Sequence, residues 1–286
     1  MPFIDPVRIE IPSAHSIPLV LDSPHSGTRY PSDFRATKPI SALQTAEDTH
    51  VDALFSTAPS LGATFICAEF PRCYIDCNRR VDDIDPSLLA SKWPEAIHPS
   101  EQTRLGYGLA WRLLDDGSEI YDRKLSVDEL KARIENCYVP YWASLTHSID
   151  SLYEKFGVVY HLNCHSMPAR ATHASHLPLG TPHADIVLGN RDGTACDESL
   201  ISCIEHVLRG EGLKVARNDP YKGVALVQAF GNPARGRQSV QIEINRSLYM
   251  NEITRETTAS FSQVKSVVNR MLLAVAQLAA AEIQIN

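Results

Sequence analysis

The stretch VVYHLNCHSMP (158–168) decides how this chain is expected to fold. Residues 158–164 are mostly apolar or small, which predicts a buried strand. The strand ends on His165. An imidazole without partners would cost free energy at a buried position, so this histidine needs a structural or a functional explanation.

The segment directly before this strand, residues 126–157, predicts a long helix. Ser126 and Glu129 form a capping box at its start, and Gly157 can end it. Pro140 lies inside the segment and should kink the helix or split it in two.

Strands and helices alternate along the rest of the chain. Apolar or alternating runs predict further strands at 17–27, 63–70, 73–77, 184–190, 213–218 and 238–245. Helices are expected at 40–62, at 196–212 and at roughly 255–284, with a loop-rich excursion at about 80–125. This alternation is typical of an α/β domain around a mixed, largely parallel sheet. No repeat, low-complexity segment or linker divides residues 1–286, so we expect a single domain.

The composition is that of a soluble globular protein, with 44% hydrophobic and 21% charged residues. The net charge of −7 argues against a general nucleic-acid binder, which needs a basic face. No apolar run reaches the roughly 18–20 residues that span a bilayer, and the N-terminus lacks a signal-peptide pattern. We therefore expect a cytoplasmic protein without a membrane partner. The seven cysteines include no C-x-x-C pair, which argues against a disulfide framework and a zinc knuckle.

Polar residues at the carboxyl ends of the predicted strands are the candidates for a site, because ligands of open α/β sheets bind there. His25 and His165 each follow a strand, with small neighbours that leave room around the imidazole. Two imidazoles and one carboxylate, with a fourth position open to water, make a catalytic zinc site. Glu47, Asp48 or Asp52 could supply the carboxylate. The alternative is that each histidine is a buried polar group satisfied by hydrogen bonds.

The segment YIDCNRR (74–80) places Asn78, Arg79 and Arg80 at the end of a short predicted strand. An arginine fork matches a carboxylate with two parallel hydrogen bonds, and asparagine adds a neutral donor. The segment is therefore a candidate for binding an acidic substrate. The alternative is a surface ion pair with one of the aspartates that follow.

Glu243 lies among apolar residues in the predicted strand 238–245. A carboxylate in such surroundings is costly unless it is paired, coordinated or functional. Partial desolvation would raise its pKa toward the range in which it can transfer protons. The alternative is a structural ion pair between Glu243 and Arg246.

Several other kinds of catalytic site are excluded by the sequence. LGNRDG (188–193) lacks the glycine spacing of a dinucleotide-binding turn, and no phosphate-binding loop occurs. SPHSG (23–27) is not the G-x-S-x-G motif of serine hydrolases. Cys164 and His165 are neighbours on a strand and face opposite sides, which argues against a thiol nucleophile.

The ordered set of motifs resembles the N-formylglutamate amidohydrolase family. The motifs are DSPHSG, EDTHVD, YIDCNRR, GLAWRLLDDGSEIYDRKLS, YHLNCHSMP, DIVLGNRDG and VQIEINRSLYM. They span roughly residues 18–251, most of the chain. The resemblance implies a fold similar to zinc carboxypeptidases and aspartoacylases, a three-layer α/β/α sandwich with the metal at the carboxyl edge of the sheet.

The resemblance also implies one Zn²⁺ bound by His25, His165 and an acidic residue. Of Glu47 and Asp48 in EDTHVD, Asp48 is favoured. The position of this ligand departs from the H-x-x-E spacing of carboxypeptidases, because Thr28 stands where that motif has its glutamate.

Substrate binding and catalysis are implied in the same way. Asn78 and Arg79 resemble a pair that holds a substrate carboxylate, and Glu243 resembles a general base. The implied reaction cleaves N-formyl-L-glutamate to formate and L-glutamate, in histidine degradation. Because this small-molecule substrate is a dicarboxylate, an acidic protein must build a cationic pocket for it. Arg79 is the first candidate, and Arg80 and Arg246 are further ones.

Two alternative functions stay open at this point. The chain could be another zinc deacylase or carboxypeptidase-like hydrolase of N-acyl amino acids. It could also be a non-catalytic protein that keeps the scaffold and binds an acidic ligand without turnover.

Overall fold

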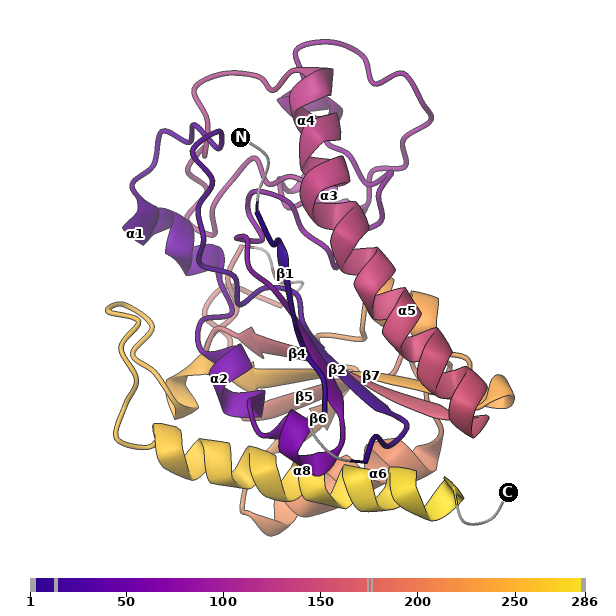
Figure 1. Ribbon diagram of the computed structural model, residues 1–286. Coiled ribbons are helices and arrows are strands. Elements are labelled where there is room, and N and C mark those ends of the chain that lie inside the picture. Colours follow the sequence, from indigo (N-terminus) through magenta and orange to yellow (C-terminus); the bar gives the residue numbers. More distant parts are fainter. Residues whose placement is uncertain (1–3, 13–14, 174, 176, 284–286) are drawn as a thin grey trace.

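A mixed sheet forms the centre of the fold in the computed structural model, which describes residues 4–12, 15–173, 175 and 177–283. Within this part of the chain seven strands pair in the order β1-β3-β2-β4-β7-β5-β6 (Figure 1). The strands are β1 (Val7–Glu10), β2 (Leu19–Ser23), β3 (Thr64–Ala68), β4 (Val159–Met167), β5 (Ile186–Gly189), β6 (Val215–Arg217) and β7 (Arg237–Asn245). Adjacent strands run parallel except in the β1–β3 and β5–β7 pairs. The predicted mixed, largely parallel sheet is confirmed.

Helices cover both faces of this sheet, so the fold has the three layers that were predicted (Figure 1). The α-helices are α1 (Ile40–Leu43), α2 (Val51–Phe55), α3 (Glu101–Arg104), α4 (Val127–Arg133), α5 (Val139–Phe156), α6 (Glu198–Gly210), α7 (Ala225–Phe230) and α8 (Phe261–Ile283). Short 3-10 turns cover Gln44–Ala46, Ala58–Leu61, Pro86–Leu88, Pro233–Arg235 and Arg246–Leu248. α2, α6 and α8 pack on one face of the sheet, and α5 and α7 pack on the other.

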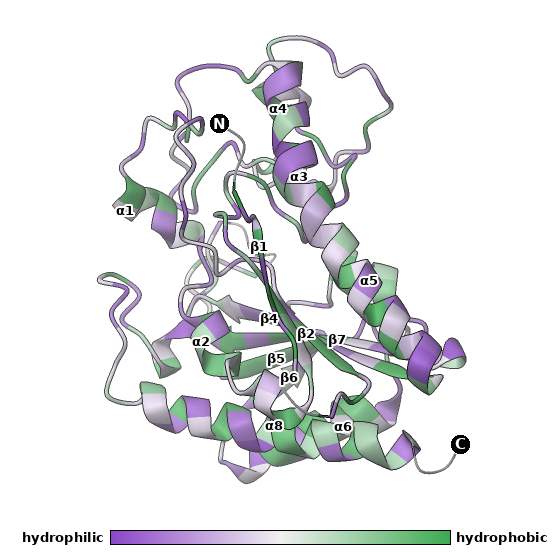
Figure 2. Cartoon of the chain, in the orientation of Figure 1, coloured by the Kyte–Doolittle hydropathy of each residue, from purple (hydrophilic) through white to green (hydrophobic). Residues whose placement is uncertain are grey.

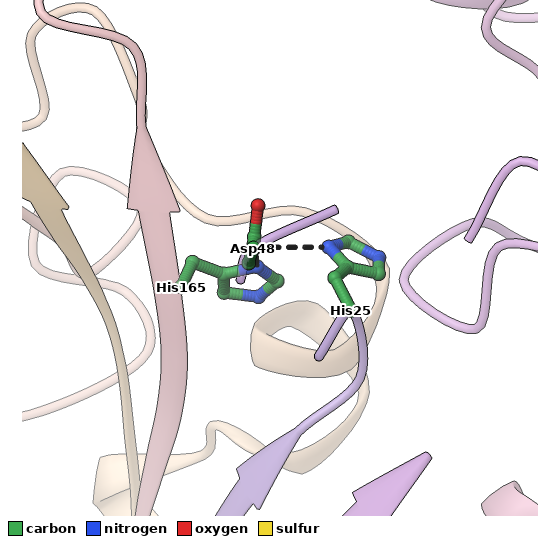
Figure 3. Close-up of side chains that lie close together, drawn as sticks. All are labelled: His25, Asp48 and His165. Carbon is green, nitrogen blue, oxygen red and sulfur yellow. Dashed lines mark hydrogen bonds and ion pairs between the residues drawn. The ribbon is translucent and has the colours of Figure 1, made fainter. Parts of the chain in front are cut away.

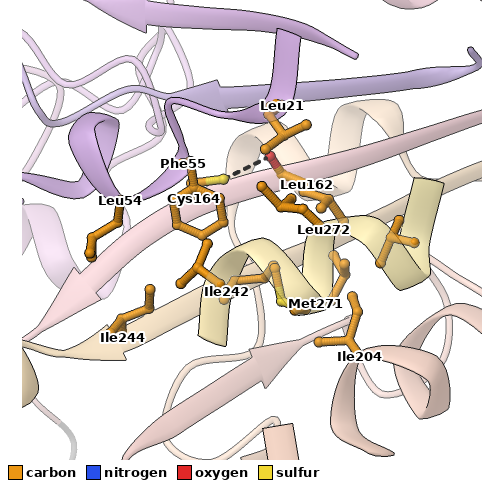
Figure 4. Close-up of a cluster of buried hydrophobic side chains, with 14 of the residues drawn as sticks. Leu21, Leu54, Phe55, Leu162, Cys164, Ile204, Ile242, Ile244, Met271 and Leu272 are labelled. Atoms are coloured by element: carbon orange, nitrogen blue, oxygen red, sulfur yellow. Dashed lines mark hydrogen bonds between the residues drawn. The ribbon is translucent and has the colours of Figure 1, made fainter. Parts of the chain in front are cut away.

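The alternation of side chains along the strands separates an apolar core from the polar face. Leu162 and Cys164 of β4 pack with Ile242 of β7 and Met271 of α8 (Figure 4). The polar residues that alternate with them point to the other face, where His161 contacts a ring of α7. The predicted site residues His165 of β4 and Glu243 of β7 therefore lie on the face covered by α5 and α7.

The single helix predicted at 40–62 is wrong, because this segment is divided into α1, a 3-10 turn, α2 and a second 3-10 turn. His50 directly before α2 has a left-handed backbone with φ of 67°, which cannot occur inside a continuous right-handed helix. The break places Asp48 outside any helix. Asp52, one of the three candidate ligands, lies in α2 and pairs with Arg8.

The helix predicted at 126–157 is interrupted, as expected from Pro140. A π-helical turn, Ile134–Tyr138, separates α4 from α5 just before this proline. Proline has no N–H to donate to the carbonyl four residues earlier, so the regular helical pattern fails at this point. The Ser126 hydroxyl accepts a hydrogen bond from the Glu129 N–H, and Gly157 ends α5 with φ of 74°.

The strand predicted at 73–77 is wrong. The segment forms turns instead, in which the Tyr74 N–H donates to the Pro71 carbonyl and the Asp76 N–H donates to the Leu109 carbonyl. The excursion at 80–125 is loop-rich as predicted, with α3 and one 3-10 turn in it. The elements β1, α3 and α7 were not predicted because they are too short to show a clear period.

Among the described residues one helix is long and apolar enough to span a bilayer by length and composition, over Phe261–Glu282 of α8. This corrects the expectation that no run has that length. One side of α8 buries Val268, Met271 and Val275 against the core, and polar residues lie on the other side (Figure 2). The apolar composition therefore has an explanation in core packing.

Replacing Gly27 with alanine should destabilise the protein. Gly27 lies where the chain after β2 crosses the chain after β3, and a methyl group there would overlap the Phe70 carbonyl oxygen. Because both partners are backbone, the overlap is relieved only by moving a segment, and we expect a cost of about 1–3 kcal/mol in the free energy of unfolding. Urea unfolding measures it. Gly210→Ala in α6, where the new methyl group meets no atom within 4 Å, is the control and should be neutral or stabilising.

Candidate active site

Three buried side chains converge at the carboxyl edge of the sheet (Figure 3). His25 follows β2, His165 lies near the end of β4, and Asp48 comes from the break before α2. Asp48 Oδ2 lies 3.0 Å from His165 Nδ1 and 3.4 Å from His25 Nδ1. The three candidate ligand atoms all lie within 4.8 Å of one another.

Hydrogen bonds on the far side of each imidazole fix which nitrogen faces the centre. Asp76 Oδ1 lies 2.7 Å from His25 Nε2, and an ionised carboxylate can only accept, so this Nε2 carries the hydrogen. Asn163 Oδ1 lies 2.8 Å from His165 Nε2, while Asn163 Nδ2 donates to Asp22. This contact is shorter than the 3.1 Å between Asn78 Nδ2 and the same Nε2, so it assigns the hydrogen to Nε2. Both Nδ1 lone pairs therefore point toward Asp48.

This donor set fits a divalent metal ion. Burial lowers the pKa of His165, which keeps its imidazole neutral. His25 Nδ1 is buried and has no hydrogen-bond partner in the described part of the chain. Burial alone would raise the pKa of Asp48, but its contacts with His165 and His25 hold it well below the ordinary range. Two lone pairs and a carboxylate that face one another repel, and a divalent cation between them would remove this repulsion. Ligating histidines usually donate their other N–H, as these do.

The other predicted acidic ligand, Glu47, faces away from the histidines. Its carboxylate accepts hydrogen bonds from Tyr30 at 2.5 Å and from Thr49 at 3.3 Å. Arg255, from the loop after β7, donates to the Glu47 carbonyl. The structure thus brings Asp48, and not Glu47, to the two imidazoles.

Glu243 lies beside this cluster, because β7 pairs with β4 in a register that places Glu243 next to His165. Its side chain is buried and accepts a hydrogen bond from Gln241 Nε2 at 2.7 Å. Burial raises the pKa of Glu243 to about 8, and the negative charge of Asp48 adds to this effect. Among the described residues, Glu243 does not form the alternative ion pair with Arg246. Arg246 donates instead to Asp48 Oδ1 at 2.9 Å.

The four predicted substrate-binding residues have different surroundings. Arg79 lines the cavity, and its buried Nε has no hydrogen-bond partner within the described residues. Asn78 also lines the cavity, but its amide oxygen accepts from the Leu226 N–H, and its Nδ2 lies 3.1 Å from His165 Nε2 and 3.4 Å from Asn163 Oδ1. Arg246 is held by Asp48. These three residues therefore reach the site with different numbers of donors left for a ligand.

Arg80 lies outside the cavity, which corrects its expected role as a substrate-binding residue. Its guanidinium is exposed and pairs with Asp82 on the surface. This is the surface ion pair that was considered as the alternative for the segment 74–80. Neighbouring residues in a turn point in different directions, so Arg79 can face the cavity while Arg80 faces solvent.

Sequence reasoning assigned no role to Arg72 or Asp76. Arg72 packs over the Trp111 ring at 4.8 Å, donates to Asp76 Oδ2 at 3.1 Å, and lies 3.6 Å from Asp48 Oδ1. Arg72 belongs to the Pro-Arg turn expected between two strands, and Asp76 lies in the segment 73–77 that was wrongly predicted as a strand, so neither position had a pattern that assigned it a role. Asn163 and Gln241 could have been found, because each lies two residues before a predicted site residue and shares its strand face.

A cavity of about 360 Å³ joins these groups. Its walls include the candidate metal ligands His25 and His165, Glu243, and residues of the loop-rich segment such as Trp111 and Asp115. The volume is at the lower end of the range for small-molecule pockets. The cavity is therefore suited to a small ligand that meets both acidic and cationic groups.

Comparison with known proteins identifies the family. The family model described as N-formylglutamate amidohydrolase matches residues 17–250. The chain belongs to this family. The resemblance inferred from the motifs is confirmed.

Individual members of the family are similar over nearly the whole chain. The N-formylglutamate deformylase of Pseudomonas putida is 29% identical over 263 residues, which are 90% of this chain and 91% of that protein. The crystal structure of N-formylglutamate amidohydrolase from Ralstonia eutropha is 47% identical, has a TM-score of 0.93, and covers 97% of this chain and 99% of that chain. A gene product from Agrobacterium tumefaciens shares the fold at 21% identity, with a TM-score of 0.62 and 95% coverage of both chains.

The raised pKa of Glu243 predicts how the stability of the metal-free protein depends on pH. In the folded protein this pKa rises from its ordinary value of 4.5 to about 8, so between these values the folded state holds a proton that the unfolded state has released. The resulting stabilisation is complete below the lower value and is lost as the pH rises through the higher one. Urea unfolding of chelator-treated wild type and Glu243→Gln should show the wild type losing stability relative to the variant across this window. A constant difference between the two proteins would contradict the shift.

Proposed function

We propose that this protein is a metal-dependent amidohydrolase that cleaves N-formyl-L-glutamate to formate and L-glutamate, a reaction of histidine degradation. The observation that supports this most is the convergence of His25, Asp48 and His165 at a cavity that the buried Glu243 also lines. The names of the family and of the similar proteins point to the same substrate.

Zn²⁺ is the ion that we propose for the site, held by His25 Nδ1, His165 Nδ1 and an Asp48 oxygen. Two imidazoles and one carboxylate are a ligand set of catalytic zinc and leave a position open. A divalent ion there would polarise the formyl carbonyl and lower the pKa of a water molecule. Asp76 and Asn163 orient the imidazoles through their Nε2 hydrogens.

Glu243 is the residue that we propose to carry the proton. As the water oxygen bonds to the formyl carbon, the Glu243 carboxylate accepts a proton from the water. The C–N bond then breaks, its electron pair goes to the nitrogen, and Glu243 delivers the proton to that nitrogen. A pKa raised toward neutrality suits both steps, because the group must gain and lose the same proton.

The arginines of the cavity would neutralise the two carboxylates of the substrate. Arg79 is the strongest candidate, since its buried Nε lacks a partner among the described residues. Arg72 also faces the cavity, where its charge is shared with Asp76 and Asp48. Arg246 is held by Asp48 and by Ser166, so its main effect would be to position Asp48.

A substrate panel tests this function with the purified, zinc-loaded protein. We expect N-formyl-L-glutamate to be hydrolysed with a kcat/KM higher than that of N-acetyl-L-glutamate. N-formyl-L-norleucine, which lacks the side-chain carboxylate, should be slower by at least about 10-fold, because a buried guanidinium would lose its partner. A preference for acetyl or longer acyl groups would favour another deacylase, and metal binding without turnover of any substrate would favour a non-catalytic protein.

A further inference from the structure

Gln241 is a buried residue of the cavity to which the proposed mechanism assigns no contact with the substrate. It lies on β7 two residues before Glu243, so the two side chains share one face of the strand. The Gln241 side chain lines the same cavity as Glu243 and the two histidines, and the residue is only 4% exposed.

The orientation of the Gln241 amide follows from its contact with Glu243. Gln241 Nε2 lies 2.7 Å from Glu243 Oε1. When Glu243 is ionised and ready to accept a proton, its carboxylate can only accept hydrogen bonds, so Gln241 must present its N–H to Glu243. The carbonyl oxygen of Gln241 then points elsewhere, and it has no hydrogen-bond partner in the described part of the chain.

Neither neighbouring strand can satisfy this oxygen with a side chain. By register Gln241 lies between Asn163 of β4 and Gly189 of β5. The Asn163 amide is engaged with His165 and Asp22, and Gly189 has no side chain. A buried carbonyl oxygen without a partner is costly, which indicates that a ligand supplies the missing donor.

We propose that Gln241 Oε1 accepts the N–H of the scissile amide and, after cleavage, an N–H of the released amino group. This rests on the proposed function, in which Glu243 protonates the same nitrogen, so the nitrogen must come within reach of the side chain that holds Glu243. Gln241 thereby restricts the substrates to N-acyl derivatives of primary amines, which keep one hydrogen on the amide nitrogen. An acyl group carried on oxygen has no hydrogen to offer.

The test compares N-formyl-L-glutamate with its ester analogue, L-2-(formyloxy)glutarate, in which oxygen replaces the N–H. The quantity compared is the ratio of the rate for the amide to the rate for the ester. For zinc-loaded wild type we expect this ratio of kcat/KM values to exceed the ratio of the alkaline hydrolysis rate constants at least about 10-fold, because only the amide satisfies the buried acceptor. In Gln241→Met this extra preference should disappear. The variant also loses the N–H that holds Glu243, which should lower kcat/KM for both substrates, so the ratio in wild type is the primary measurement.

Gln238→Met is the matched control, since Gln238 is a buried glutamine of the same strand whose amide pairs with Asp197 outside the cavity. It should keep the wild-type ratio. If wild type shows no extra preference for the amide, or if Gln241→Met keeps it, the proposal is overturned while the hydrolase function stands. Another acceptor, such as Asp115, would then be the candidate partner of the amide N–H. If zinc-loaded wild type hydrolyses neither compound, the function and this proposal both fail. The wild-type ratio decides the matter even where Gln241→Met does not fold.

Discussion

Glu243→Gln is expected to keep its metal and to lose nearly all activity toward N-formyl-L-glutamate. The glutamine has the shape of the glutamate but cannot accept a proton from water at neutral pH. We expect kcat to fall by about 10²–10⁴-fold, the usual contribution of a general base. The side chain does not belong to the histidine–aspartate cluster, so the zinc content should stay at the wild-type level. Steady-state kinetics and metal analysis on the same preparation measure both quantities.

Glu47→Gln is the control for this experiment, because Glu47 is a second buried glutamate near the site whose side chain faces Tyr30 and Thr49. Its activity should stay within a few-fold of wild type. Full activity in Glu243→Gln would remove Glu243 from the role of base, and loss of zinc in that variant would place it among the metal ligands.

The sequence predicted those parts of the site that follow from strand ends. His25 and His165 were selected because the carboxyl ends of parallel strands meet at one edge of a sheet, and this rule needs only local patterns. Glu243 was selected because a carboxylate in an apolar strand is unusual. The structure brings all three side chains to one cavity.

The sequence could not predict the parts that depend on contacts between distant segments. Asp48 reaches the histidines because the chain breaks between α1 and α2, and Arg246 and Arg255 from the other end of the chain hold this break through hydrogen bonds to residues 45–49. Local propensity favours a continuous helix there, and tertiary contacts override it. The roles of Arg72 and Asp76 were missed for the same reason, because turn residues show no period and their contacts with His25 and Trp111 join distant segments.

His25→Ala is expected to remove the metal and, with it, the activity. The variant loses one of three protein ligands, so the affinity for Zn²⁺ should fall by more than the roughly 10–100-fold that follows the loss of a residue that only orients a ligand. Asp76→Asn should show this smaller loss of zinc affinity, since Asp76 accepts the His25 Nε2 hydrogen and lies outside the cluster of ligands. Competition with a chelator gives the affinities, and kcat at saturating zinc gives the activities. His98→Ala, at an exposed histidine that pairs with Asp82, should change neither. The assignment of His25 Nδ1 as a ligand would be contradicted if Asp76→Asn bound zinc more weakly than His25→Ala. It would also be contradicted if His25→Ala kept one tightly bound zinc.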